Sequence, residues 1–314
     1  MRHRVPHILA SVLLAAVLSV PAGATDANFS PSDVLNGTKA SRDACTGSAV
    51  WVVVDGQGDC IAYYAGGLEA HNPTAIIFFQ GDLITRYWDD LGNTTDQSVD
   101  PSYAQDSPAH EAELAARWAP RLGAPYIFLA RPGTYGSSGD HKERRRLREV
   151  LLVDAALSAI KQRDQIESLV LVGQSSGGHL VGALLVTRHD ISCAVAASGV
   201  TAVRRRVELH RWPADATGFQ DYWDPADHVG EIMPAPGLRI FVVGDPADLN
   251  VPFPAQSYWF DLLKKRGLDA TLMIGAAVGP QHHGLATTGL TIAGLCAHHA
   301  PTAAIDEAVK QLKG

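Results

Sequence analysis

The chain has 314 residues, a formal net charge of −7 at pH 7 and 46% hydrophobic residues. This composition excludes a disordered or collagen-like chain, and the length suffices to bury one large core or two smaller ones. The acidic balance argues against general nucleic-acid binding, because neutralising phosphates requires a basic surface. We therefore expect no nucleic-acid partner.

The first 24 residues have the pattern of a secretory signal peptide. Arg2 and Arg4 form a basic head, an apolar run covers Ile8 to Val20, and Ala22-Gly23-Ala24 is a small-residue cleavage site. The apolar run is shorter than the about 20 residues that span a bilayer, and no later segment is long and apolar enough. We expect a periplasmic or secreted protein with no membrane span once the signal is removed.

Four cysteines lie beyond this segment, and an even number in an exported protein permits two disulfides. Cys45 and Cys60 flank a predicted hairpin and form the natural local pair, provided that residues 46–49 fold back along the hairpin. This leaves Cys193 to pair with Cys296. The spacing lacks the close cysteine pairs of a zinc site, so we expect no metal.

The chain then alternates between β-rich and helical segments. Residues 25–48 form an N-terminal arm, which we expect to be loosely held because it is polar over 25–44. A hairpin follows, with Ala49–Asp55 and Cys60–Ala65 flanking Gly56-Gln57-Gly58. Continuous apolar runs then predict parallel strands buried on both faces. They cover Thr74–Gln80, Tyr126–Ala130, Leu169–Val172, Cys193–Ala197, Leu238–Val243 and Ala270–Ile274.

Helical segments separate these strands. They are His110–Leu122, Glu143–Arg163, Gly178–Thr187, Ala255–Arg266, Thr288–His298 and Thr302–Leu312. A hairpin followed by this alternation predicts a single α/β domain over 49–314, with a mostly parallel sheet and helices on both faces. The connections 82–107 and 199–236 exceed ordinary loop lengths, so we expect both to be functional.

The strongest local motif is Gly173-Gln174-Ser175-Ser176-Gly177, a G-x-S-x-G sequence between an apolar strand and a helical segment. A serine on such a sharp turn needs small residues two positions before and after it, and the N-terminus of the next helix favours negative charge. The motif predicts Ser175 as a nucleophile. The alternative nucleophile, Ser176, fits the motif less well because Gln174 rather than glycine lies two residues before it.

A serine nucleophile needs a general base and an acid that orients the base. Asp245 and Asp248 follow one predicted strand, and His282 and His283 follow the next. Both segments therefore lie past the carboxyl ends of strands, where open α/β sheets carry their sites. The residues by themselves leave open which aspartate and which histidine take part.

These motifs resemble those of α/β-hydrolase-fold serine hydrolases, and the last third of the chain is similar to the catalytic domain of prolyl-oligopeptidase-like enzymes. The similarity rests on Ile240–Gly244, Asp248, Val251-Pro252, Gln256-Ser257 and His283-Gly284. The resemblance implies an α/β-hydrolase fold with an eight-stranded sheet and a lid inserted at about 199–236. It also implies Asp248 as the acid and His283 as the base, with Asp245 and His282 as alternates, and no cofactor.

An oxyanion hole needs two backbone N–H groups. One is expected from Ser176, the residue after the nucleophile. The other is expected after Gln80-Gly81-Asp82, which resembles the strand-end His-Gly dipeptide of the family. By position the donor is the Asp82 N–H, with Gly81 as the alternative. The Asp82 carboxylate must then point away from the developing negative charge.

The function we expect is hydrolysis of a carboxylic ester or amide through an acyl-enzyme, on a small-molecule ester or a short peptide. Ser176 stands where the peptidases commonly have tyrosine, and only the short arm lies between the predicted signal and the hairpin, so we expect no propeller domain. Esterase activity is therefore at least as well supported as peptidase activity. A non-catalytic binding scaffold is the alternative from another class, and the oligomeric state stays open.

Aromatic residues in the two long segments admit two interpretations. Aromatic side chains there either line an apolar pocket or anchor the loops to the core. They are Tyr87, Trp88, Tyr103, Trp212, Phe219, Tyr222 and Trp223. The runs Arg144–Arg146 and Arg204–Arg206 are expected to be solvated charged faces.

Overall fold

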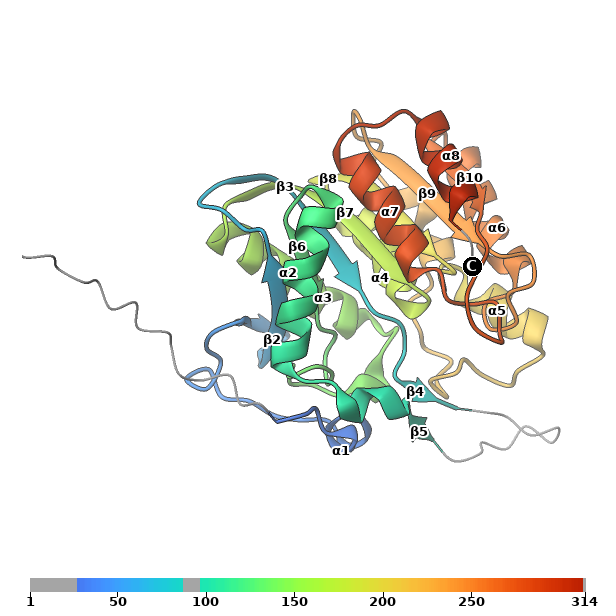
Figure 1. The fold of residues 1–314 in the computed structure, drawn as a ribbon. Coiled ribbons are helices and arrows are strands. Elements are labelled where there is room, and N and C mark those ends of the chain that lie inside the picture. The colour runs from blue at the N-terminus through green and yellow to red at the C-terminus, as the bar shows by residue number, and fades with distance from the viewer. Residues whose placement is uncertain (1–26, 87–96, 313–314) are drawn as a thin grey trace, which may run out of the picture.

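The computed structural model describes residues 27–86 and 97–312 (Figure 1). The predicted signal peptide at 1–24 and the aromatic pair Tyr87 and Trp88 lie outside the described residues. In the part of the chain that is described, no helix is long and apolar enough to cross a membrane.

The core of the molecule is an eight-stranded, mostly parallel sheet in the order β1-β2-β6-β3-β7-β8-β9-β10. Its strands are β1 (Ala49–Val54), β2 (Gln57–Gly66), β3 (Asn72–Phe79), β6 (Tyr126–Leu129), β7 (Ile166–Gln174), β8 (Ile191–Ala197), β9 (Arg239–Gly244) and β10 (Ala270–Ile274). Within this sheet only the pairs β1–β2 and β2–β6 are antiparallel. This is the α/β-hydrolase sheet that the sequence predicts. Strands β4 (Ile84–Thr85) and β5 (Ser98–Val99) form a separate small ribbon.

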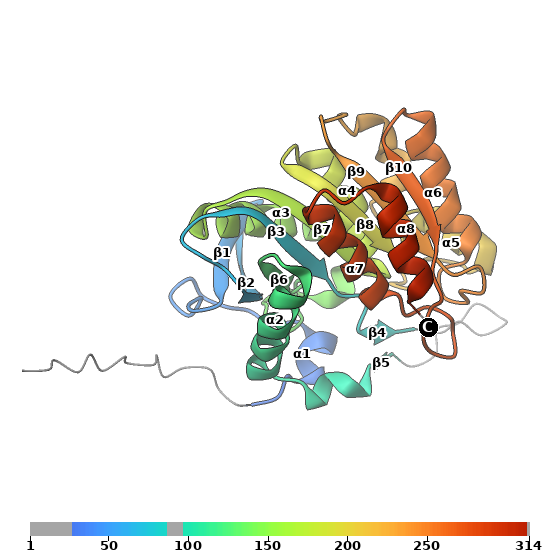
Figure 2. The same ribbon diagram turned by 45° about the horizontal axis from the view of Figure 1, so that its top comes forward.

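Helices cover both faces of the sheet (Figures 1 and 2). One face packs on α3 (Leu147–Arg163), α4 (Ser176–Thr187) and α6 (Phe253–Lys265), and the other on α2 (Pro108–Leu122), α7 (Ala286–Ala297) and α8 (Thr302–Gln311). Side chains of β3 alternate between the two cores: Ile77 enters the first and Ile76 the second. Because both faces of the sheet are buried, the sequences of its strands are continuous apolar runs.

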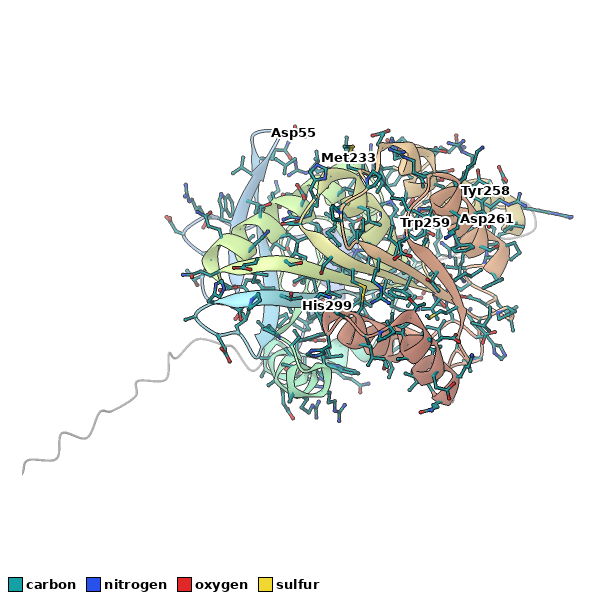
Figure 3. All side chains as sticks on the ribbon, turned by 90° about the horizontal axis from the view of Figure 1, so that it is seen from above. Asp55, Met233, Tyr258, Trp259, Asp261 and His299 are labelled. Carbon is teal, nitrogen blue, oxygen red and sulfur yellow. A yellow bond between two sulfur atoms is a disulfide. The ribbon has the colours of Figure 1, made fainter. Side chains whose placement is uncertain are left out.

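Helix α6 illustrates how each helix presents one face to the sheet. Trp259 is fully buried against the first core, whereas its neighbour Tyr258 is 44% exposed (Figure 3). Trp259 is the largest of the fully buried side chains. Burying an aromatic side chain of this size contributes on the order of 3 kcal/mol, which fixes α6 beside β9 and β10.

The hairpin turn lies earlier in the chain than the predicted Gly56-Gln57-Gly58. The turn consists of Asp55 and Gly56, with φ of 51° and 74°, and β2 begins directly at Gln57. An Asp-Gly pair supplies the two positive φ angles that a tight two-residue turn requires. Because the strands pair up to this turn, Cys60 lies opposite Trp51.

The N-terminal arm is packed rather than loose, which corrects the expectation drawn from its polar composition. Phe29 and Val34 are buried, and Val34 lies on the short helix α1 (Pro31–Asn36). The Phe29 ring stacks on Tyr103 with 5.5 Å between centroids and meets Tyr135 edge-on. A few apolar side chains thus anchor an otherwise polar segment.

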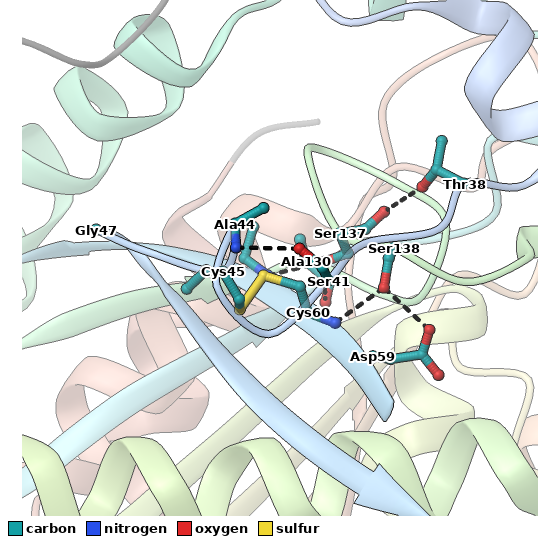
Figure 4. The surroundings of a disulfide bond; sticks show 12 residues. Thr38, Ser41, Ala44, Cys45, Gly47, Asp59, Cys60, Ala130, Ser137 and Ser138 are labelled. Atoms are coloured by element: carbon teal, nitrogen blue, oxygen red, sulfur yellow. Dashed lines mark hydrogen bonds between the residues drawn. A yellow bond between two sulfur atoms is a disulfide. The ribbon is translucent and has the colours of Figure 1, made fainter. Parts of the chain in front are cut away.

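Two disulfides cross-link the molecule, one local and one between segments distant in the chain. Cys45 and Cys60 are bonded, with 5.5 Å between their Cα atoms, because the residues before β1 fold back along the hairpin (Figure 4). Cys193 of β8 is bonded to Cys296 of α7, with 6.4 Å between the Cα atoms. Both separations lie within the range of ordinary disulfides.

The segment 199–236 holds two short elements, α5 (Val203–His210) and the 3₁₀ helix η3 (Pro225–Glu231). Another departure from prediction concerns α3, which begins at Leu147 rather than Glu143. Residues His141–Glu143 form a separate 3₁₀ turn, η2, and Arg145 has a left-handed φ of 66° that breaks the helix.

Candidate active site

Ser175 lies on a strained turn between β7 and α4. Its φ and ψ are 56° and −121°, a backbone conformation that a residue with a side chain rarely adopts. A Cβ at Gly173 would lie 2.2 Å from the carbonyl carbon of Gly177, and one at Gly177 would lie 2.1 Å from the Phe79 oxygen. Glycine is therefore required on both sides of Ser175, which is the physical basis of the motif.

Ser175, His283 and Asp248 form one hydrogen-bonded chain. His283 Nε2 lies 2.8 Å from Ser175 Oγ, and His283 Nδ1 lies 2.9 and 3.0 Å from the two Asp248 carboxylate oxygens. Ser175 follows β7, Asp248 follows β9 and His283 follows β10, so the three residues meet at the carboxyl edge of the sheet. The Asp248 side chain is fully buried, while that of His283 is 16% exposed and accessible to a substrate.

Further hydrogen bonds fix the Asp248 carboxylate. The backbone N–H groups of Asn250 and Val251 each donate to Oδ1 at 2.9 Å. The Gln256 amide donates to Oδ2 at 3.2 Å and to the Val251 carbonyl at 2.7 Å. The sequence motif contains Gln256 but gives no indication of this role. A carboxylate held this way has one orientation toward His283.

The alternates Asp245 and His282 form a separate pair. Asp245 accepts hydrogen bonds from the Ala247 and Ala277 N–H groups at 2.8 and 3.0 Å, and lies 3.7 Å from His282 Nδ1. Burial opposes ionisation of Asp245, but these contacts outweigh it and lower its pKa. The His282 side chain is 53% exposed. This pair therefore stabilises the adjoining loops, outside the hydrogen-bonded chain of Ser175.

The expected oxyanion loop lies directly against Ser175. A Cβ at Gly81 would lie 3.0 Å from Ser175 Cβ and 3.6 Å from Oγ, so only glycine lets the backbone approach this closely. The Asp82 carboxylate points away into a set of arginines, with Arg131 Nη1 and Arg144 Nε each at 3.0 Å and Arg145 in contact. Burial opposes ionisation of Asp82, but these guanidinium groups hold its pKa well below its usual range.

The arginine runs are not the solvated faces that we expected. Arg144, Arg145 and Arg206 are almost fully buried, whereas Arg146 is half-buried and only Arg204 and Arg205 are exposed. The charges of Asp82 and Asp215 offset the cost of burying these guanidinium groups. Backbone carbonyls also accept hydrogen bonds from Arg144 and Arg206. Burial raises the pKa of Asp215, but Arg145 and Arg206 reverse this and lower it to about 2.

Ser175 and His283 open into a cavity of about 300 Å³. Its lining includes Gly81, Asp82, Arg206 and Trp212. Of the predicted aromatic residues, Trp212 lines this cavity, whereas Tyr103 belongs to the core and Trp223 stacks on His228. Both interpretations of the aromatic residues thus hold, each for different residues.

A larger cavity of about 590 Å³ lies between the arm, the hairpin and the start of α3. It contains none of the residues around Ser175, so size does not identify the candidate active site here. In residues 27–86 and 97–312, no group of three or more His, Cys, Asp or Glu side chains is arranged to hold a metal ion.

One protein family matches part of the chain in sequence. Residues 141–289 match the prolyl oligopeptidase family, and this segment contains Ser175, Asp248 and His283. No curated protein matches the chain in sequence.

Three solved structures have a fold similar to that of this chain. An acylaminoacyl peptidase in complex with Z-Gly-Gly-Phe-chloromethyl ketone has 13% identity and a TM-score of 0.54, over 80% of this chain and 40% of the peptidase. A Pyrococcus furiosus esterase has 11% identity and a TM-score of 0.56, over 90% of this chain and 99% of the esterase. A puromycin-hydrolyzing peptidase of Mycobacterium tuberculosis has 14% identity and a TM-score of 0.51, over 81% and 40%. The chain thus spans less than half the length of either peptidase.

The fold is that of the α/β hydrolases, and the family match makes the chain similar to serine hydrolases of this fold. Within that class, the segment from η2 to the first turn of α7 is similar to the prolyl oligopeptidase family.

Proposed function

We propose that this protein is an exported serine hydrolase that cleaves a carboxylic ester or an amide through an acyl-enzyme on Ser175. The observation that carries the proposal is the unbroken set of contacts from Ser175 Oγ through the His283 ring to Asp248. This arrangement lets a serine hydroxyl lose its proton as it attacks.

The reaction follows from these contacts. His283 Nε2 accepts the Ser175 proton as Oγ bonds to the substrate carbonyl carbon, and the carbonyl electron pair moves onto oxygen. The tetrahedral intermediate then expels the leaving group, which takes the proton from His283. A water molecule, deprotonated by His283, attacks the acyl-enzyme, and its collapse releases the acid and returns the proton to Ser175. Asp248 holds the Nδ1–H tautomer and stabilises the imidazolium.

Two backbone N–H groups would stabilise the oxyanion. Ser176 supplies one as the first residue of α4, and the Asp82 N–H, or that of Gly81, supplies the other. The proposal is supported by the close approach of Gly81 to Ser175 and by the direction of the Asp82 carboxylate, which faces the arginines.

The cavity favours a small substrate. Its volume of about 300 Å³ is at the lower end of the range of ligand pockets. We therefore expect short acyl esters to be preferred. In a series of p-nitrophenyl esters, kcat/KM should be highest for acetate to butyrate and fall with longer chains. A rise through octanoate and beyond would contradict this assignment.

Peptide hydrolysis is the second candidate, favoured by the match of residues 141–289 to the prolyl oligopeptidase family. Aminoacyl-Pro amides, assayed beside the esters, separate the two activities. Turnover of the esters without the amides supports the esterase, and faster turnover of the amides supports the peptidase. Turnover of neither class would support the non-catalytic scaffold.

Export is supported by two disulfides, since such bonds persist in oxidising compartments. The signal pattern of residues 1–24 points the same way. Mass spectrometry of the unreduced protein from the exported fraction should find no alkylatable thiol and an N-terminus just after Ala24. Four alkylatable thiols, or an N-terminus at Met1, would contradict export.

A further inference from the structure

One guanidinium contacts the side chains of both residues from which we expect oxyanion N–H groups. Arg145 Nη1 donates to Ser176 Oγ at 2.7 Å, and the same nitrogen donates to Asp82 Oδ2. Ser176 follows the nucleophile, and Asp82 ends the loop that packs on it. Arg145 therefore joins two backbone segments that are distant in the sequence but face the same side of Ser175.

Arg145 is itself rigidly held. Its side chain is fully buried, its Nε donates to Asp215 Oδ2 at 2.9 Å, and its backbone N–H donates to Glu149 Oε2 at 2.6 Å. Burial disfavours the charged guanidinium, but the carboxylates of Asp215 and Asp82 outweigh this and raise the pKa of Arg145. The guanidinium is thus charged, and these contacts hold it in one position.

Other residues fix the Asp82 end of this connection. Arg131 and Arg144 hold the Asp82 carboxylate from two further directions, and the Leu83 N–H donates to His141 Nε2 at 3.3 Å. At the other end the Ser176 side chain is fully buried, and Arg145 is the partner of its hydroxyl. The loop and the start of α4 consequently have little freedom to move apart.

We propose that Arg145 is a positioning residue, which holds the backbones of Ser176 and Asp82 so that their N–H groups converge on the oxyanion. This inference rests on the proposed function. It also assigns a role to the Ser176 hydroxyl, which takes no part in the nucleophilic attack. The alternative is that Arg145 only stabilises the fold as part of a buried ion-pair network.

The Ser176→Ala variant tests the proposal with little disturbance. It removes the hydroxyl and leaves both the backbone N–H and the Arg145–Asp82 contact in place. Loss of a whole oxyanion donor costs about 10²- to 10³-fold in kcat, so misalignment of one should cost about tenfold. We expect kcat on p-nitrophenyl acetate to fall by that factor with KM nearly unchanged.

A trifluoromethyl ketone provides a readout that a merely structural role would not affect. Ser175 adds to its carbonyl to form a stable tetrahedral oxyanion, so its Ki reports oxyanion binding. In Ser176→Ala, Ki should rise by the same factor as kcat falls. Arg145→Lys, which keeps the charge but loses the planar fork, should change both quantities in the same direction and by more.

A matched control comes from a buried arginine at the other end of α4. Arg188 pairs with Asp154 and Asp190, so Arg188→Lys should lower Tm without changing kcat or Ki. Unchanged kcat and Ki in Ser176→Ala would overturn the proposal while leaving the hydrolase function intact. A wild-type protein that neither turns over ester nor binds the ketone would instead overturn the proposed function.

Discussion

The side-chain amide of Gln174 donates to the backbone carbonyl of His283 across 2.7 Å. Its amide oxygen accepts from the Leu285 N–H at 2.9 Å, so one buried glutamine clamps both sides of the histidine. Gln174 is the last residue of β7 and immediately precedes Ser175. The position of the proposed base is thus fixed relative to the proposed nucleophile by a residue of the nucleophile motif itself.

Replacing Gln174 by glutamate should impair the enzyme without removing any proposed catalytic group. The carboxylate cannot donate to the His283 carbonyl, so the loop should shift and kcat on p-nitrophenyl acetate should fall by about 10- to 100-fold. Gln220→Glu is the matched control, because the Gln220 amide also donates to a backbone carbonyl but is exposed. Equal activity of the two variants would contradict the proposed role of Gln174 in positioning His283.

The two adjacent histidines should differ sharply. His283→Ala removes the proposed general base and should lower kcat by about 10⁶-fold, as measured for such residues in another serine hydrolase. His282→Ala removes an exposed side chain that pairs with Asp245, so kcat should change by less than about threefold. Steady-state kinetics of both variants decide this. Equal losses would mean that His282 also acts in the site.

The two aspartates should separate in the same way. Asp248→Asn leaves the shape of the acid but stabilises the wrong His283 tautomer, and should lower kcat by about 10⁴-fold. Asp245→Asn weakens the hydrogen bonds to the Ala247 and Ala277 N–H groups, so it should lower Tm with little change in kcat. The reverse pattern in kcat would assign the acid to Asp245.

Glu111 provides a pH-dependent prediction. Burial, aided by the hydrogen bond and charge of Asp106, raises the pKa of Glu111 from 4.5 to about 9. In the unfolded chain the group ionises near 4.5, so between these pH values ionisation favours unfolding, and the cost grows as pH rises. Glu111→Gln should therefore raise Tm at pH 8 by about 4 °C or more and leave it unchanged at pH 4. The same Tm difference at both pH values in thermal melts would contradict this cause.

The sequence predicts most of the fold because its signals are local. Apolar runs such as the one ending β7 are bounded by turn residues, and from β3 onward each strand of the large sheet is separated from the next by a helical segment. The G-x-S-x-G motif is equally local. Its glycines are needed because a side chain at either position would clash within the turn or with the neighbouring strand. The parallel strands then bring residues from three strand ends to one edge of the sheet, but the preference for Asp248 over Asp245 and for His283 over His282 came from the family resemblance and not from these local signals.

The buried polar groups could not be predicted in the same way. A run such as Arg144–Arg146 resembles a solvated face, because its partners Asp82 and Asp215 are more than 60 residues away in the sequence. The role of Gln174 depends on a carbonyl more than 100 residues downstream. Likewise, the polar arm gave no sign that Phe29 would enter an aromatic cluster with Tyr103 and Tyr135. Such contacts depend on tertiary structure, which periodicity does not encode.

The central claim is that Ser175 is an activated nucleophile, and labelling with a fluorophosphonate tests it most directly. The probe reacts rapidly only with a serine whose proton can be removed, and mass spectrometry locates the adduct. We predict a single adduct on Ser175 in the wild type, none in Ser175→Ala, and labelling slowed by orders of magnitude in His283→Ala. An unlabelled wild type, an adduct on Ser176, or undiminished labelling without His283 would contradict the account.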